Sequence, residues 1–218
     1  MVASRPPLPR SSRVVVYIDG FNLYYGVLKF SKEKWLNIER LFRLLRPHDA
    51  IQKIRYFTAL SHGGKSADQL AYLKALETLP LVNIVLGRYK KKSAKCLVSA
   101  CAVADKDRIF TTQEEKRTDV NIAVSMLDDA YQNLGDHLVV VSGDSDLVPA
   151  VNMVKTRFPH IAVTVYVPSR DPIRGAAVEL RSAADKDRDL PLNLLRLAQL
   201  PASVPDGSGG FIAKPPTW

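Results

Sequence analysis

Two kinds of hydrophobic pattern alternate along the chain. Short apolar runs rich in β-branched residues predict strands buried on both faces, and longer segments with apolar residues three and four positions apart predict helices. The predicted strands cover residues 13–19, 51–60, 81–88, 138–141 and 161–167. The predicted helices cover residues 36–46, 65–79, 119–132, 147–158, 174–184 and 192–200. Strands that alternate with helices form a parallel sheet, so we expect an α/β fold with helices on both faces.

Charged residues and helix periodicity refine this outline. In the predicted helix 119–132 one apolar stripe is formed by Val120, Ala123, Val124, Leu127 and Tyr131. Asp128 and Asp129 turn away from Asp119 and are expected on the solvated surface. The alternating acidic and basic residues of 185–189 are expected to be an exposed run. Residues 93–116 carry both cysteines and mixed charges, which favours a loop or a small hairpin insertion.

Length and composition fit one sizeable domain with tails. The chain has 218 residues, of which 46% are hydrophobic. Residues 1–12 are expected to be a flexible N-terminal lead without the apolar stretch of a secretory signal, and residues 201–218 a flexible tail rich in Pro, Gly and Ser. No apolar run reaches the roughly 20 residues that span a bilayer, so no membrane partner is expected. Two cysteines exclude a disulfide scaffold and favour a cytoplasmic location.

The charge balance is basic. Lys and Arg number 31 against 22 Asp and Glu, which gives a net charge of +9. A basic periphery attracts polyanions, while a local group of acids can hold cations. The same balance also fits a soluble basic protein without such a partner, so charge alone leaves both interpretations open.

Four carboxylates are predicted to meet at one edge of the sheet. Asp19 ends the first strand, Asp144 and Asp146 follow the fourth, and Asp119 opens the helix that precedes the fourth. In right-handed βαβ units the carboxyl ends of strands and the first turns of the following helices share one edge. If the first and fourth strands are neighbours, that edge has a crevice between them, where ligands bind in open α/β sheets.

Each of these acids also has a structural interpretation. Asp146 could cap a helix, Asp119 could interact with a helix dipole, and Asp19 could accept a hydrogen bond from a loop. Four converging carboxylates repel one another, however, and a divalent cation is the usual offset. Oxygen ligands without His or Cys favour Mg²⁺ or Mn²⁺ over zinc, and such a site suits phosphoryl chemistry.

Three short motifs in order resemble the signatures of a known family. They are YIDGFN at 17–22, EKRTDV at 115–120 and VSGDSDL at 141–147. Together they resemble the NYN-domain family of the PIN-like nuclease superfamily, and within it the LabA-like subgroup, over about residues 13–185. The resemblance implies a Rossmann-like parallel sheet in a single NYN domain at 13–200. It also implies a ribonuclease, a hydrolase that cleaves RNA phosphodiester bonds with Mg²⁺ or Mn²⁺.

The resemblance also assigns roles to individual positions. It places the catalytic and metal-binding acids at Asp19, Asp119, Asp144 and Asp146. Supporting polar positions fall on Asn22 and Ser142, and an RNA-binding lysine on Lys116. Arg117 stands where many relatives have glycine, which could alter the approach of RNA. Relatives often carry a paired-cysteine segment before this lysine, but here only Cys96 and Cys101 are present, so a zinc site is not expected.

A basic run offers a further contact with RNA. Lys90, Lys91, Lys92 and Arg88 could bind phosphates while Tyr89 stacks on a base of single-stranded RNA. The alternative is a solvated loop after an edge strand. We favour binding, because the third strand would place this run near the carboxylate edge.

Three other functions compete with a metal-dependent ribonuclease. A phosphatase of the haloacid-dehalogenase type requires an acid two residues after Asp19, where this chain has Phe21. A topoisomerase-primase domain uses Glu at the position of Asp19. A non-catalytic RNA-binding or regulatory module with the same fold is compatible with the sequence, because intact acids do not prove turnover.

Overall fold

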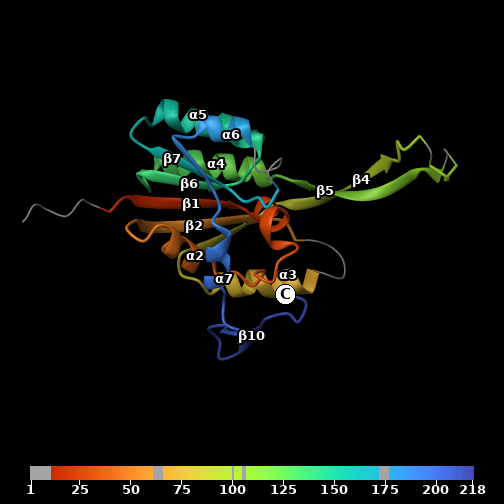
Figure 1. Cartoon of the computed structure of the whole chain (residues 1–218), viewed down its shortest axis with the longest axis horizontal. Helices are drawn as coiled ribbons and strands as arrows, with labels where there is room; N and C mark the ends of the chain where they lie inside the picture. The colour runs from red at the N-terminus through yellow and green to blue at the C-terminus, as the bar shows by residue number, and fades with distance from the viewer. Residues whose placement is uncertain (1–10, 61–65, 100, 105–106, 172–176) are drawn as a thin grey trace, which may run out of the picture.

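The computed structural model describes residues 11–60, 66–99, 101–104, 107–171 and 177–218. A sheet of six parallel strands forms its centre, in the order β3-β2-β1-β6-β7-β8 (Figure 1). The strands are β1 (Arg13–Asp19), β2 (Ala50–Thr58), β3 (Val82–Leu86), β6 (His137–Val141), β7 (Ala162–Val167) and β8 (Lys186–Asp189). The predicted α/β fold with a parallel sheet is confirmed.

Helices cover both faces of this sheet (Figure 1). One face carries α2 (Ile38–Leu45), α3 (Ser66–Glu77) and α7 (Leu192–Leu197). The other carries α4 (Thr118–Tyr131), α5 (Val148–Arg157) and α6 (Val178–Ala183). Shorter helical segments are α1 (Gly20–Leu23), the π-helix η1 (Tyr24–Leu28) and the 3₁₀-helix η3 (Ser145–Leu147). Within the described ranges, every helix is too short or too polar to cross a bilayer.

The two central strands, β1 and β6, supply the middle of two hydrophobic cores. Along β1 the side chains of Val14, Val16 and Ile18 enter one core, and those of Val15 and Tyr17 enter the other. This alternation is what a strand covered on both faces requires, and it explains the unbroken apolar run in the sequence. The direct pairing of β1 with β6 confirms that the first and fourth predicted strands are neighbours.

Helix α4 turns only part of the predicted apolar stripe toward the core. Ala123 and Leu127 pack against the core, whereas Val120, Val124 and Tyr131 face solvent with 64%, 59% and 73% of these residues exposed. Ile122 and Met126 are fully buried instead. Both stripes have helical spacing, so periodicity within the helix cannot choose between them.

The buried face of α4 also carries a charge that was predicted to be solvated. Asp129 is fully buried, whereas the neighbouring Asp128 is exposed as predicted. The carboxylate of Asp129 accepts hydrogen bonds from Tyr17 Oη at 2.8 Å and from Arg55 Nε at 2.8 Å, and it also pairs with Arg55 Nη2. The prediction for Asp129 was wrong because its partners lie on β1 and β2, which are remote in the sequence.

The charged run at 185–189 forms part of the sheet. Residues Lys186–Asp189 are β8, which pairs with β7 at the edge. Arg181 of α6 bridges Asp187 at 2.7 Å and also pairs with Asp189. Charged side chains are common on edge strands, where they hinder pairing with another chain, and this explains why the run has no strand-like hydrophobic pattern.

Residues 201–218, for which the composition predicts a flexible tail, form a small hairpin in this structure. Its strands are β9 (Ser203–Pro205) and β10 (Phe211–Ala213). The chain then ends on Trp218, whose ring centroid lies 6.5 Å from that of Trp35 and 5.1 Å from that of Tyr72. Contact between these aromatic rings offers a physical reason for the end of the chain to stay on the domain.

The buried ion pair gives a test of the fold. Replacing Asp129 by Ala leaves Arg55 and Tyr17 without their acceptor, so we expect Asp129→Ala to lower the free energy of unfolding by about 3 kcal/mol. The matched control is Asp128→Ala, one residue earlier on the exposed face, which should change it by less than about 0.5 kcal/mol. Urea denaturation measures both. Equal losses in the two variants would show that Asp129 makes no special contribution.

Candidate metal centre

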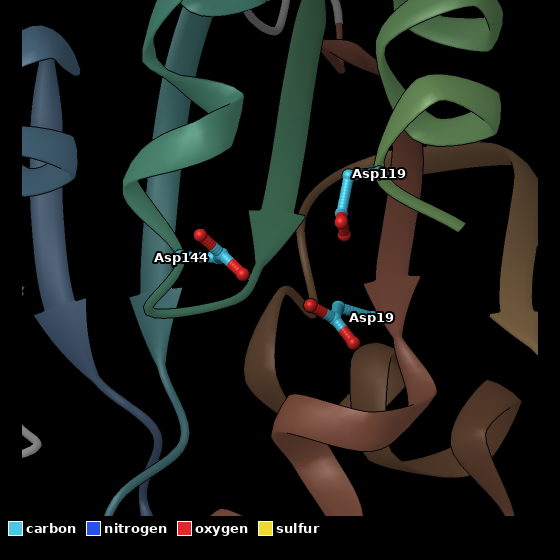
Figure 2. A group of neighbouring side chains, drawn as sticks. All are labelled: Asp19, Asp119 and Asp144. Atoms are coloured by element: carbon cyan, nitrogen blue, oxygen red, sulfur yellow. The ribbon is translucent and has the colours of Figure 1, made fainter. Parts of the chain in front are cut away.

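Three aspartates meet at the carboxyl edge of β1 and β6. Asp19 is the last residue of β1, Asp144 precedes η3 just after β6, and Asp119 lies in the first turn of α4. One carboxylate oxygen from each lies within 4.8 Å of the other two. Figure 2 shows the three side chains directed toward a common space. Ile18 pairs with Val141 in the sheet, so both strands end at the same level and their acids meet.

Hydrogen bonds from the chain fix the orientation of Asp19. This residue is only 3% exposed and caps α1, where its Oδ1 accepts from the backbone N of Asn22 at 3.0 Å. Its Oδ2 accepts from Asn22 Nδ2 at 2.6 Å and from Ser142 Oγ at 3.0 Å. Asn22 and Ser142, both expected to support the site, therefore contact Asp19 directly.

The same two side chains shape the turn that carries Asp144. The backbone N of Asp144 donates to Ser142 Oγ at 3.1 Å, and that of Gly143 donates to Asn22 Oδ1 at 3.2 Å. Asp144 Oδ1 accepts in turn from the backbone N of Asp146 at 3.0 Å. The turn after β6 is thus tied to the turn after β1, and Asp19 and Asp144 are positioned as a unit.

Asp119 is positioned by an unusual entry into α4. Arg117, just before the helix, has φ +84°, in the left-handed region that favours glycine. A non-glycine residue is strained in this conformation, which glycine would adopt freely. Glu115 accepts from the backbone N of Thr118 at 3.1 Å and also from the Thr118 hydroxyl. The sequence assigned no role to Glu115, because Glu-x-x-Thr is the reverse of the order found in a capping box.

The electrostatics of the trio favour a bound cation. Burial, with repulsion from Asp19 and Asp144, raises the pKa of Asp119 to about 6. Burial also raises the pKa of Asp19, against the hydrogen bonds from Asn22 and Ser142. A divalent cation would offset this repulsion, and an all-oxygen donor set fits Mg²⁺ or Mn²⁺. The residues present therefore fit the metal implied by the sequence.

Asp146 lies apart from the other three acids. Its side chain is exposed, and it does not belong to the group whose oxygens converge. Its charge still contributes to the raised pKa of Asp119, so it lies nearby. The sequence predicted four aspartates in one cavity, and the structure brings three together. The difference arises because η3 starts at Ser145 and turns the next side chain toward solvent.

The predicted RNA-binding residues lie on a two-stranded hairpin that projects from the body (Figure 1). Its strands are β4 (Arg88–Lys95) and β5 (Ile109–Lys116), so the hairpin is longer than the insertion predicted for 93–116. Strand alternation places Lys90 and Lys92 on one face with Arg88. Lys116 lies opposite Arg88 on that face, and its Nζ is 3.0 Å from Glu114.

The other face of the hairpin carries Tyr89 and Lys91. Tyr89 packs edge-on against Phe21 of α1, with ring centroids 6.0 Å apart. Phe21 is two residues from Asp19, so this contact links the base of the hairpin to the metal centre. Beyond β4, Cys96 and Cys101 are free and half-buried.

Residues 13–191 match the NYN domain. The chain belongs to the NYN-domain family. The motifs that carry the resemblance in the sequence are the segments that bring Asp19, Asp119 and Asp144 together in space.

Two relatives of this NYN domain have different names. It is 28% identical to 6-hydroxy-3-succinoylpyridine 3-monooxygenase HspA of Pseudomonas putida, over 94% of this chain and 75% of that protein. It is 27% identical to the Low amplitude and bright protein LabA of Synechococcus elongatus, over 83% of this chain and 85% of that protein. The second match supports the predicted LabA-like assignment.

A crystal structure supports the fold alone. A protein of unknown function from Vibrio parahaemolyticus superimposes on this NYN domain with a TM-score of 0.52 at 16% identity. The match covers 85% of this chain and 96% of that one.

Melting curves can separate a metal ligand from a structural acid. We expect Mn²⁺ at a hundred times its Kd to stabilise the parent by about 2.7 kcal/mol, because the ion binds only the folded state. Asp144→Asn removes one repelling charge, so in chelator it should melt no lower than the parent, yet it should lose most of the Mn²⁺ response. The matched control is Asp146→Asn, which should keep that response. A variant at Asp144 that melts lower in chelator and responds fully to Mn²⁺ would identify Asp144 as structural.

Proposed function

We propose that this NYN domain is a metal-dependent ribonuclease that cleaves phosphodiester bonds of single-stranded RNA. The observation that carries the proposal is the convergence of Asp19, Asp119 and Asp144 at the carboxyl edge of the two central strands. These residues would hold Mg²⁺ or Mn²⁺, which when bound can activate water and stabilise charge on a phosphate and its leaving oxygen. This is the chemistry that phosphodiester hydrolysis needs.

The chain's own groups would orient the reaction. Asn22 and Ser142 donate to Asp19 and hold its carboxylate in one orientation. Asp119 faces Asp19 and Asp144 from the first turn of α4, so as a metal ligand it would complete the set of carboxylates that positions the ion. Asp146 is exposed beside the trio, and in this proposal it assists through an intervening water.

RNA is the proposed substrate because a basic surface leads to the acids. The hairpin extends from the residues beside Phe21, and it carries Arg88 and three consecutive lysines together with Tyr89. Cationic side chains bind the phosphate backbone without regard to sequence, and an aromatic ring can stack on an unpaired base. Lys116 and Arg117 sit between the hairpin and α4, next to Asp119, where they can contact the same strand.

Two other functions compete with the proposed ribonuclease. A non-catalytic RNA-binding module would use the same hairpin without cleavage. Oxygenation of a pyridine ring, the reaction in the name of the Pseudomonas relative, is favoured by one observation, an aromatic-lined cavity beside the acids. That reaction needs dioxygen and a reductant, whereas RNA hydrolysis needs only water.

Incubation of the pure protein with labelled single-stranded RNA tests the proposal. We expect cleavage with Mn²⁺, none with chelator, and a loss of at least a hundredfold for Asp144→Asn, because one charged ligand is removed. Retained RNA binding without any cleavage by the parent would favour the non-catalytic module. Uptake of oxygen on adding 6-hydroxy-3-succinoylpyridine and a reduced nicotinamide cofactor would favour oxygenation.

The hairpin lysines give a separate test of RNA binding. Replacing Lys90, Lys91 and Lys92 together by Ala should weaken binding and reduce the slope of log K against log salt by roughly 0.7 for each lost phosphate contact with a single strand. Fluorescence anisotropy at several salt concentrations measures this slope. As a control, Lys32 and Lys34, which precede α2, can be replaced by Ala without affecting the slope. An unchanged slope in the triple variant would make the run an ordinary solvated strand.

A further inference from the structure

A cavity of about 330 Å³ opens directly beside the metal centre. Its walls come from α1, from the π-helix η1 and from the segment after β7. They include Phe21, Asn22, Tyr25, Gly26, Pro168 and Ser169. Its size lies at the lower end of the range for small-ligand sites, and its lining combines aromatic rings with a few polar groups.

The cavity and the metal centre share a wall. Asn22 lines the cavity, and the same amide donates to Asp19 Oδ2 at 2.6 Å and accepts from the backbone N of Gly143 at 3.2 Å. A group bound in the cavity would therefore lie one side chain away from the acids. A phosphodiester at the acids and a group in the cavity would then be adjacent parts of one ligand.

Aromatic rings on the wall are held by edge contacts. Phe21 meets Tyr89 at an interplanar angle of 84°, and Tyr25 meets Tyr24 at 85° with ring centroids 5.3 Å apart. In these perpendicular contacts the rings are not stacked in parallel on one another. Tyr25 is 49% exposed, which is high for a large aromatic residue beside an acidic site. Lys29 Nζ lies over one face of the Tyr25 ring, 4.9 Å from its centroid, so a planar ring of a ligand would stack on the other face.

The wall is a fixed feature of the backbone. A Cβ added at Gly26 would lie 1.7 Å from the carbonyl O of Pro168, so the π-helix and the segment after β7 are in direct contact. Arg170 reinforces this contact: its backbone N donates to Gly26 O at 3.2 Å and its Nε to Val27 O at 3.0 Å. Single π-turns are found frequently at functional sites, and here one forms a cavity wall.

We propose that this cavity is a subsite for one nucleobase of single-stranded RNA, that of the nucleotide next to the scissile phosphate. The inference rests on the proposed ribonuclease function and adds to it how the strand is held at the acids. A strand that follows the hairpin would pass Tyr89 and Phe21 and place one base against Tyr25. The adjoining phosphate would then face Asp19, Asp119 and Asp144.

Photocrosslinking locates the base without requiring cleavage. A short uridine oligomer that carries 4-thiouridine is irradiated with the full-length parent protein in chelator, and the adduct is mapped by mass spectrometry. We expect the crosslink within residues 21–25. A crosslink confined to the hairpin lysines or to another part of the chain would overturn the subsite.

Affinity of the same oligomer tests the stacking partner. Tyr25→Leu should weaken binding roughly tenfold, as expected when one base–aromatic stack is lost, and it should abolish the crosslink. The matched control is Tyr131→Leu, an exposed tyrosine on α4 whose replacement should leave both unchanged. Equal affinity of the parent and Tyr25→Leu would contradict the proposal. Competition by uridine monophosphate as effective as the oligomer would also contradict it, because the cavity would then be a site for free nucleotides.

Failure of the subsite and failure of the ribonuclease function give different results. Cleavage by the parent with an unaltered rate in Tyr25→Leu and no crosslink at 21–25 would reject the subsite alone. A crosslink at 21–25 that is lost in Tyr25→Leu, from a protein that cuts no RNA, would support base binding and reject catalysis. Melting temperatures equal to the parent's show that both variants are folded.

Discussion

The in-register pairing of β1 with β6 is the constraint on which the rest of this site depends. Asp19 and Asp144 are far apart in the sequence, and neither has a local means of finding the other. Because Ile18 pairs with Val141, both strands leave the sheet at the same level and the turns that follow them lie in contact. Side-chain alternation fixes this register, since a slip of one residue would turn the buried valines of β1 toward the wrong core. Hydrophobic packing therefore sets the geometry of an acidic site.

The acids themselves oppose this arrangement. Burial and the nearby carboxylates together raise the pKa of Asp119, and bringing three carboxylates within 4.8 Å adds repulsion that the fold has to offset. Part of the offset comes from donors: Asn22 and Ser142 both hydrogen-bond to Asp19, and the backbone of Asp146 donates to Asp144. These donors satisfy individual oxygens but leave the net charge in place. A bound cation would relieve the remaining repulsion, so metal binding would stabilise the folded protein relative to its metal-free form.

Local patterns were sufficient for five of the six strands of the sheet and for Asp19, Asp119 and Asp144 at its edge. The apolar runs identify the strands because a strand buried on both faces has no polar positions, and the family motifs mark the turns that follow them. Local patterns failed where the answer depends on a distant partner. The two apolar stripes of α4 have the same spacing and differ only in what they contact. Asp129 is buried because it pairs with Arg55 on β2. Residues 186–189 form a strand because they pair with β7. Asp146 was predicted to join the other acids, but the helical turn η3 directs its side chain toward solvent.

The cavity beside the acids is another feature that depends on a distant partner and could not be predicted from local patterns. Phe21 and Tyr25 lie four residues apart and would be assigned to the core from their residue types, but the backbone contact between Gly26 and Pro168 builds a wall beside them. No pattern near residue 26 indicates that the segment after β7 will meet it. The contact joins the segment after β1 to the segment after β7. It therefore bridges the point between β1 and β6 where the strand order reverses, which is also where the acids meet. In the proposed ribonuclease, this one topological feature would provide both the site for a phosphate, held through the metal, and the site for a nucleobase. A polynucleotide carries these two groups side by side on every residue.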